Sequence, residues 1–282
     1  MLNPTAIKLL IRQYNLGISP RRMGQHFLVD PRALARIASE IGAIPGERLL
    51  EIGAGLGALT EELLVSGATV YAVERDARFL KVLTDRFRSS ENLQLVRSDI
   101  LKVDLGSYAL AEPKSLLVVG NIPYSMTSPI LEFLIHQRQW VKRVVLTIQK
   151  EVALRIVASP GTKVYSSISL FVQSAFKPSI AFTIPPGSFY PQPKVTSAVL
   201  RLDPLPHPII SPDEEAAVLK LGRLLFAHRR KTILNVLSMS GLGFTKEDLS
   251  SRLKNALIDP IRRPETLTIP EVVSLHRALS VR

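Results

Sequence analysis

Short apolar runs alternate with amphipathic segments of helical length between Leu49 and Lys150, and this alternation constrains the fold more than any other feature. The apolar runs predict buried strands, and apolar positions at helical spacing between them predict helices. Connections of this length join parallel strands through covering helices, so we expect an α/β protein whose parallel sheet is covered on both faces. The expected strands are LLEIG, TVYAVE, LQLVRSD, LLVVGN and RVVLTIQ, and the expected helices are ALTEELLVSG, DARFLKVLTDRF and SPILEFLIHQ.

The pattern changes after Lys150. EVALRIVAS and YSSISLFVQSAF have helical patterns, and SIAFTI and TSAVLRLD then predict an antiparallel hairpin at the sheet edge. Four prolines between residues 204 and 212 indicate a linker. Only helical patterns follow: one helix or a broken pair through DEEAAVLKLGRLLFAHRRKTILNVLS, then two helices with capping patterns at Thr245 and Thr268. We therefore expect two domains, residues 1–205 and an all-α domain of residues 206–282.

Composition narrows the classes of function. The net charge of +12 favours a polyanionic partner, and we place nucleic acid ahead of an anionic membrane surface and of solubility alone. The chain has no cysteine, and its five histidines are scattered, so we expect no metal. Apolar stretches of the ~18–20 residues that span a bilayer are missing from the sequence. The start of the chain does not have a signal-peptide pattern, so we expect the protein to stay where it is made.

A glycine-rich turn, EIGAGLGALT, joins the first expected strand to its helix. Gly53, Gly55 and Gly57 allow a tight turn and close approach of a ligand, but such a turn is a weak signal alone. Glu74 ends the next strand 21 residues after Gly53, where ribose-binding carboxylates lie in such folds, and Asp99 follows the third. Either acid singly could be a solvated strand end. The three together favour an adenosine-containing ligand, and without a P-loop they favour S-adenosylmethionine over ATP or NAD.

Asn121 ends the fourth expected strand on the same edge. An Asn-x-Pro sequence is ordinary turn chemistry, so a structural role is open. Beside a methyl donor, the Asn121 side-chain oxygen and the Ile122 carbonyl could accept both hydrogens of an adenine amine and direct its lone pair at the methyl group. Pro123 would fix the turn, and Tyr124 offers a face on which an extruded base can stack. Catalysis would then come from alignment and hydrogen bonding rather than from a strong base.

At these motifs the chain resembles the small-subunit ribosomal RNA adenine N6,N6-dimethyltransferases, over nearly its whole length. These are class I S-adenosylmethionine enzymes with a Rossmann-like domain and a small helical C-terminal domain. The matching segments are GQHFLVD, EIGAGLGALT, AVERD, RSDI, NIPYSMTSP, QKEVALRI, PPGSFYPQPKVTSAVLRL and FAHRRKTILN.

The family's functional residues, carried over to the matching positions, imply which residues contact the cofactor and the substrate. Cofactor contacts are implied at His26, Leu28, Gly53, Glu74, Asp99 and Asn121. Asn121 and Tyr124 would be at the target base. The family often has Asn in place of His26, which is harmless if the contact is made by the backbone and weakens cofactor binding if it is made by the side chain. Phe189 matches a family aromatic near the target pocket, although packing within the hairpin explains it equally well.

The resemblance further implies transfer of two methyl groups to each of two adjacent adenines in a hairpin near the 3′ end of 16S rRNA, during assembly of the small subunit. A folded ribosomal particle suits three basic clusters, each of which could also be a solvated surface. The clusters are Arg21-Arg22, His228-Arg229-Arg230-Lys231 and Arg262-Arg263. Within the second cluster, Arg229, Arg230 and Lys231 are our substrate-binding candidates. We expect a cytoplasmic monomer with no membrane partner.

Three other functions stay open at this point. The related large-subunit methyltransferases that confer macrolide resistance share GQ-x-FL and NIPY, although PKVTSAVLRL and FAHRRKTILN favour the small-subunit enzymes. A non-catalytic RNA-binding or assembly factor is argued against by the intact Asn121, Pro123 and Tyr124. DNA adenine methylation is disfavoured because no DNA-recognition domain is evident in the sequence.

Overall fold

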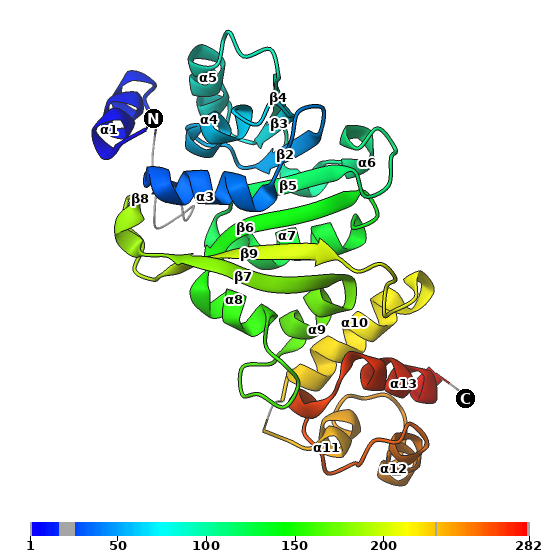
Figure 1. Ribbon diagram of the computed structural model, residues 1–282. Helices are drawn as coiled ribbons and strands as arrows, with labels where there is room; N and C mark the ends of the chain where they lie inside the picture. The colour runs from blue at the N-terminus through cyan, green and yellow to red at the C-terminus, as the bar shows by residue number, and fades with distance from the viewer. Residues whose placement is uncertain (1, 17–25, 229, 281–282) are drawn as a thin grey trace. The chain divides into compact units, whose positions relative to one another are not determined.

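The structure is a computed structural model that describes residues 2–16, 26–228 and 230–280. Its contacts divide the chain into two compact units (Figure 1): Met1–Ala153 with Pro178–Pro204, and Leu154–Lys177 with Leu205–Arg282. Residues 154–177 thus group with the helical unit, although they lie inside the range that the sequence assigns to the first domain. Within the described ranges, no helix is long and apolar enough to cross a membrane.

The first unit is built on a seven-stranded sheet of order β4-β3-β2-β5-β6-β9-β7. Its first five strands are parallel neighbours, and β9 runs antiparallel to β6, with β7 at the edge. The predicted α/β class and parallel sheet are therefore confirmed. The strands are β2 (Arg48–Ile52), β3 (Thr69–Glu74), β4 (Leu93–Arg97), β5 (Leu116–Asn121), β6 (Val141–Gln149), β7 (Phe176–Ile184) and β9 (Ser197–Pro204).

The central strand β5 is buried from Leu116 to Gly120, and its burial stops at Asn121. Leu117 and Val119 contribute to one core cluster with Leu34 and Ile37 of the helix α3 (Pro31–Ile41). Gly120 is required by close approach: a Cβ there would lie 2.8 Å from the carbonyl oxygen of Ile52 on β2. The apolar run therefore keeps β2 and β5 tightly paired up to Asn121, the first polar residue of β5.

Helices cover both faces of this sheet. The core cluster packs α3 and α4 on one face, and Figure 1 shows α7 on the opposite face from α3. The helices of this unit are α1 (Pro4–Gln13), α3 (Pro31–Ile41), α4 (Ala58–Leu64), α5 (Ala77–Arg86), α6 (Leu105–Tyr108) and α7 (Thr127–His136), with short 3₁₀ turns at Ile100–Lys102, Tyr124–Met126 and Pro186–Ser188. The helices α1 and α3 lie before the first strand that the sequence pattern predicts.

A second sheet of two short strands holds the segment before α3. The strand β1 (Phe27–Leu28) runs antiparallel to β8 (Phe189–Tyr190), which lies in the connection between β7 and β9. Phe189 pairs with Leu28 and is only 4% exposed within the same core cluster as α3. This small sheet fixes the segment that carries His26 and Leu28.

The second unit is helical around its own core. The core includes Tyr165, Leu170, Leu225 and Leu253. The segment DEEAAVLKLGRLLFAHRRKTILNVLS, predicted as either one helix or a broken pair, forms two helices, α10 and α11. Thr245 forms the predicted capping box with Asp248. The helices are α9 (Ser167–Ala175), α10 (Pro212–Phe226), α11 (Ile233–Ser238), α12 (Lys246–Asn255) and α13 (Ile269–Ser280), with a 3₁₀ turn at Pro264–Thr266, and α8 (Lys150–Ile156) spans the boundary between the units.

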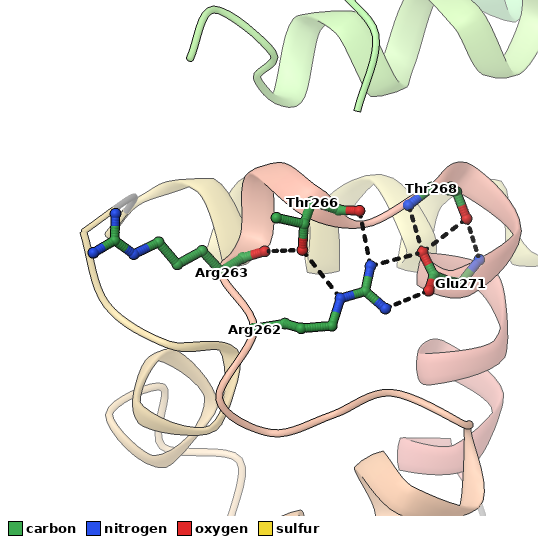
Figure 2. A network of polar contacts seen from close by, with 5 residues as sticks. All are labelled: Arg262, Arg263, Thr266, Thr268 and Glu271. Atoms are coloured by element: carbon green, nitrogen blue, oxygen red, sulfur yellow. Dashed lines mark hydrogen bonds and ion pairs between the residues drawn. The ribbon is translucent and has the colours of Figure 1, made fainter. Parts of the chain in front are cut away.

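Arg262 anchors the start of α13 (Figure 2). Its guanidinium donates to both carboxylate oxygens of Glu271 and to the side chain and carbonyl of Thr266. Glu271 also accepts from the backbone N–H of Thr268, at 2.7 Å, and so caps the helix. The Arg263 side chain extends away from this network in Figure 2 and is exposed. Arg262 is therefore part of the helical unit's own structure.

We predict that Glu271→Gln destabilises the protein by ~2 kcal/mol at pH 7, the range for charged hydrogen bonds. The Arg262 guanidinium holds the pKa of Glu271 at about 2, below its ordinary 4.5. The stabilisation is therefore full above pH 4.5 and is lost as the pH falls towards 2. Urea unfolding should give a large difference from the parent at pH 7 and a smaller one at pH 3. Arg263→Ala, the control, should cost less than ~0.5 kcal/mol. An equal loss for Glu271→Gln at both pH values would contradict this.

Candidate active site

The carboxyl ends of β2, β3, β4 and β5 meet around one cavity of about 340 Å³ in the first unit. Parallel strands bring their carboxyl ends to the same edge, so residues far apart in sequence converge there. The lining includes ten of the residues that the sequence and the resemblance single out: His26, Leu28, Gly53, Gly55, Glu74, Asp99, Asn121, Ile122, Pro123 and Tyr124.

The glycine turn follows β2 and lines the cavity with Gly53 and Gly55. Gly53 has φ +70°, and a Cβ added to it would meet no atom within 4 Å, so the space above it is open. Gly57, with φ +80°, is the N-cap residue of α4, and a Cβ there would come within 2.5 Å of the Phe87 ring. Gly57 therefore allows the helix to pack, while Gly53 leaves room for a ligand to approach the backbone.

Glu74 ties the glycine turn to the end of β3. Its carboxylate accepts from the backbone N–H of Gly55 at 3.0 Å and from that of Asp76 at 2.8 Å. A carboxylate has about four acceptor positions, so capacity is left for two further donors such as vicinal hydroxyls. Burial raises the pKa of Glu74. Asp99 follows β4 and accepts from the backbone N–H of Leu101 at 3.1 Å.

Glu51 also lines the cavity, and the sequence analysis gave it no role. It is 2% exposed, and its carboxylate accepts from the Thr60 hydroxyl at 2.6 Å. Burial raises the pKa of Glu51 to about 7, and the nearby negative charge of Glu74 acts in the same direction. Its position within the apolar LLEIG strand is the sequence signal that could have identified it, since an acid is rarely buried without a partner.

Asn121 is held by the segment that precedes β1. Its Nδ2 donates to the backbone carbonyl of His26 at 3.0 Å, so the amide nitrogen has a partner and the amide oxygen is turned away from that carbonyl. Met126 N–H donates to the Pro123 carbonyl at 2.8 Å, which starts the 3₁₀ turn after Asn121. The chain therefore leaves β5 along a defined path and presents Tyr124 beside Asn121.

Two contacts fix the Tyr124 ring. Its hydroxyl lies 2.8 Å from the Ser197 hydroxyl, and its ring stacks with that of His26, with centroids 5.8 Å apart and planes at 28°. Burial raises the pKa of Tyr124, so the phenol stays neutral at physiological pH. The ring can therefore stack with a nucleobase, while its neutral hydroxyl does not act as a proton acceptor in catalysis.

The remaining candidates lie elsewhere. Phe189 is buried in the core and is not among the residues that line the cavity, so its position fits the hairpin-packing alternative. Arg230 and Lys231 are exposed in the helical unit. Arg229, Arg21 and Arg22 lie outside the described residues.

The residues that line the cavity fit S-adenosylmethionine in their chemistry. It combines an open glycine turn, a strand-end carboxylate with spare acceptor capacity, and a mostly apolar lining that includes Phe79 and Ile100. In the described part of the chain, no group of three His, Cys, Asp or Glu side chains could hold a metal ion.

Sequence comparisons with known proteins also indicate a methyltransferase. Residues 19–274 match the family model described as ribosomal RNA adenine dimethylase. A protein named ribosomal RNA small subunit methyltransferase A from Geobacter metallireducens is 42% identical to this chain, over 93% of this chain and 96% of its own length. The protein of the same name from Alkaliphilus metalliredigens is 35% identical, over 100% of this chain and 99% of its own length.

Solved structures extend the agreement to the fold. A dimethyladenosine transferase from Plasmodium falciparum has a TM-score of 0.75 at 26% identity, with 89% of this chain and 96% of that one covered. The 23S rRNA methyltransferase ErmE has a TM-score of 0.66 at 23% identity, with 90% and 100% covered, and shows the shared fold. The predictions of a class I methyltransferase fold and of S-adenosylmethionine as cofactor are thereby confirmed, and the chain belongs to the ribosomal RNA adenine dimethylase family.

Proposed function

We propose that this enzyme transfers two methyl groups from S-adenosylmethionine to N6 of each of two adjacent adenines in a hairpin near the 3′ end of 16S rRNA. The observation that carries the proposal is the orientation of Asn121, whose Nδ2 is engaged by His26 while its oxygen remains available at the cavity. The names of the relatives at 35–42% identity support the small subunit as the source of the substrate.

The bound cofactor supplies an electrophilic methyl group. We assign Gly53, Glu74 and Asp99 to holding it, with His26, Leu28 and Asn121 beside them as the resemblance implies. The Asn121 oxygen and the Ile122 carbonyl accept the two hydrogens of the adenine amine and draw its lone pair out of conjugation with the ring. Tyr124 stacks on the extruded base, and Pro123 sets the turn. The rate then comes from alignment and fixed dipoles.

We assign these tasks to residues 1–205 as the catalytic domain and propose that residues 206–282 form a helical domain that helps to bind the ribosomal particle. Arg229, Arg230 and Lys231 are its proposed RNA contacts, and the exposure of Arg230 and Lys231 supports this. For Phe189, the sequence candidate for a substrate residue, we propose an indirect role: its backbone pairs with Leu28 and so supports the cavity wall from the core. We further propose that the enzyme is a cytoplasmic monomer that acts during subunit assembly.

Purified ribosomal subunits from a strain without the modification separate this proposal from its rival. We expect N6,N6-dimethyladenosine to form on small subunits and not on large subunits, measured by mass spectrometry of nucleosides after incubation with isotope-labelled S-adenosylmethionine. Methylation of the large subunit alone would favour the macrolide-resistance activity. Binding to either subunit without any methylation would favour a non-catalytic assembly factor.

Removal of the Asn121 side chain should abolish most of the activity. Loss of one positioned hydrogen-bonding group at a reacting centre lowers kcat by roughly 10²–10³. Asn121→Ala should therefore lower the single-turnover rate of methyl transfer to small subunits by about 100-fold. Asn255→Ala, at an exposed position of α12, is the matched control. A rate for Asn121→Ala within a few-fold of the parent would remove Asn121 from the catalytic role.

The Glu74 carboxylate is expected to act on cofactor binding. Glu74→Ala removes the acceptor for the ribose hydroxyls and the contact with Gly55, so Kd for S-adenosylmethionine should rise by about 10-fold or more, in line with loss of charged hydrogen bonds. Isothermal titration calorimetry measures this directly. Glu91→Ala is the control, because Glu91 is exposed and is not a lining residue. An unchanged Kd for Glu74→Ala would exclude the assigned contact.

A further inference from the structure

His26 makes three contacts, two with residues that line the cavity and one with the connection between β8 and β9. Its ring Nδ1 lies 2.6 Å from the carbonyl oxygen of Pro191, in the connection between β8 and β9. Its own carbonyl accepts from Asn121 Nδ2 at 3.0 Å, and its ring stacks with Tyr124. One residue thus contacts both side chains that we place at the target base, as well as a distant backbone carbonyl.

The chemistry of these contacts fixes two orientations. A backbone carbonyl oxygen can only accept, so Nδ1 of His26 must carry a proton in order to bond with Pro191. For the same reason the group of Asn121 that faces the His26 carbonyl must be the NH₂ and not the oxygen. The position of the His26 carbonyl therefore decides which end of the Asn121 amide is presented to the cavity.

We propose that His26 is a positioning residue for methyl transfer: its Nδ1–H bond to the Pro191 carbonyl holds the backbone so that its own carbonyl keeps the Asn121 oxygen facing the substrate amine. This rests on the proposed function, in which that oxygen accepts from the adenine. A flipped Asn121 amide would present donors to a donor, and the amine would lose its acceptor. His26 thus acts through Asn121 and does not touch the reacting atoms.

The proposal predicts that asparagine can replace His26. Nδ2 of an asparagine is at nearly the same distance from Cα as Nδ1 of a histidine, so both can donate to the Pro191 carbonyl. Leucine has a similar branch without a donor, and phenylalanine keeps a ring that can stack with Tyr124 but has no donor. These three replacements separate the hydrogen bond from the stacking.

The kinetic test compares His26→Asn, His26→Leu and His26→Phe in single-turnover methylation of unmodified small subunits, with Kd for S-adenosylmethionine measured by calorimetry. We expect the Leu and Phe variants to lose about 10-fold or more in rate, as misalignment at a reacting centre does, with Kd changed less than about 3-fold. The Asn variant should restore most of the rate. His207→Leu, at an exposed position of the helical unit, is the control. Activity retained by Phe but not by Asn would assign the role to stacking and overturn the proposal, as would a loss confined to Kd.

A second measurement does not depend on activity. In protein with ¹⁵N-labelled histidine at a pH where His26 is neutral, NMR should show His26 protonated on Nδ1, and His26→Asn serves to assign the signal. The Nε2-protonated form would overturn the proposal, whether or not the enzyme methylates small subunits. If the Nδ1 form is found but the parent does not methylate adenine, the proposed function fails and the hydrogen-bond chain stands.

Discussion

The pairing of β2 with β5 is the constraint on which the site depends. The two strands are in parallel register from Arg48 with Leu116 to Glu51 with Val119. They approach so closely at Gly120 that a side chain would contact the Ile52 carbonyl. This register places the start of the glycine turn and Asn121 at the same height on the sheet edge. A shift of one residue would reverse the faces of the alternating side chains and separate the two halves of the cavity.

The site is also organised by what its polar groups already bind. Glu74 uses part of its acceptor capacity on Gly55 and Asp76, and Asn121 uses its amide nitrogen on His26. In each case the bond that is made within the protein determines which atoms remain for a ligand. Such fixed dipoles need little rearrangement when a substrate binds, and in the proposed reaction, which uses no strong base, they would supply the rate.

Most of the fold, and the convergence of the strand-end residues on one cavity, could be predicted from the sequence because both depend on local patterns. Apolar runs predict strands, and the residue that ends each run must lie at the shared edge, as Glu74 and Asn121 do. The contact of His26 with Pro191 joins residues 165 positions apart and depends on strands of two residues, which leave no periodic signal. The placement of residues 154–177 with the helical unit depends on tertiary contacts in the same way.

The basic composition illustrates a further limit of sequence. Ion pairing leaves the net charge of +12 unchanged, but it decides where the excess positive charge is available. Arg262 and Arg263 are equivalent as sequence, yet Arg262 is bound to Glu271 and Thr266 while Arg263 extends away from that network. Charge attracts RNA at long range, whereas a phosphate contact needs a guanidinium that can be released from its partners at little cost. Of these two adjacent arginines, the structure leaves Arg263 suited to such a contact and uses Arg262 to hold α13.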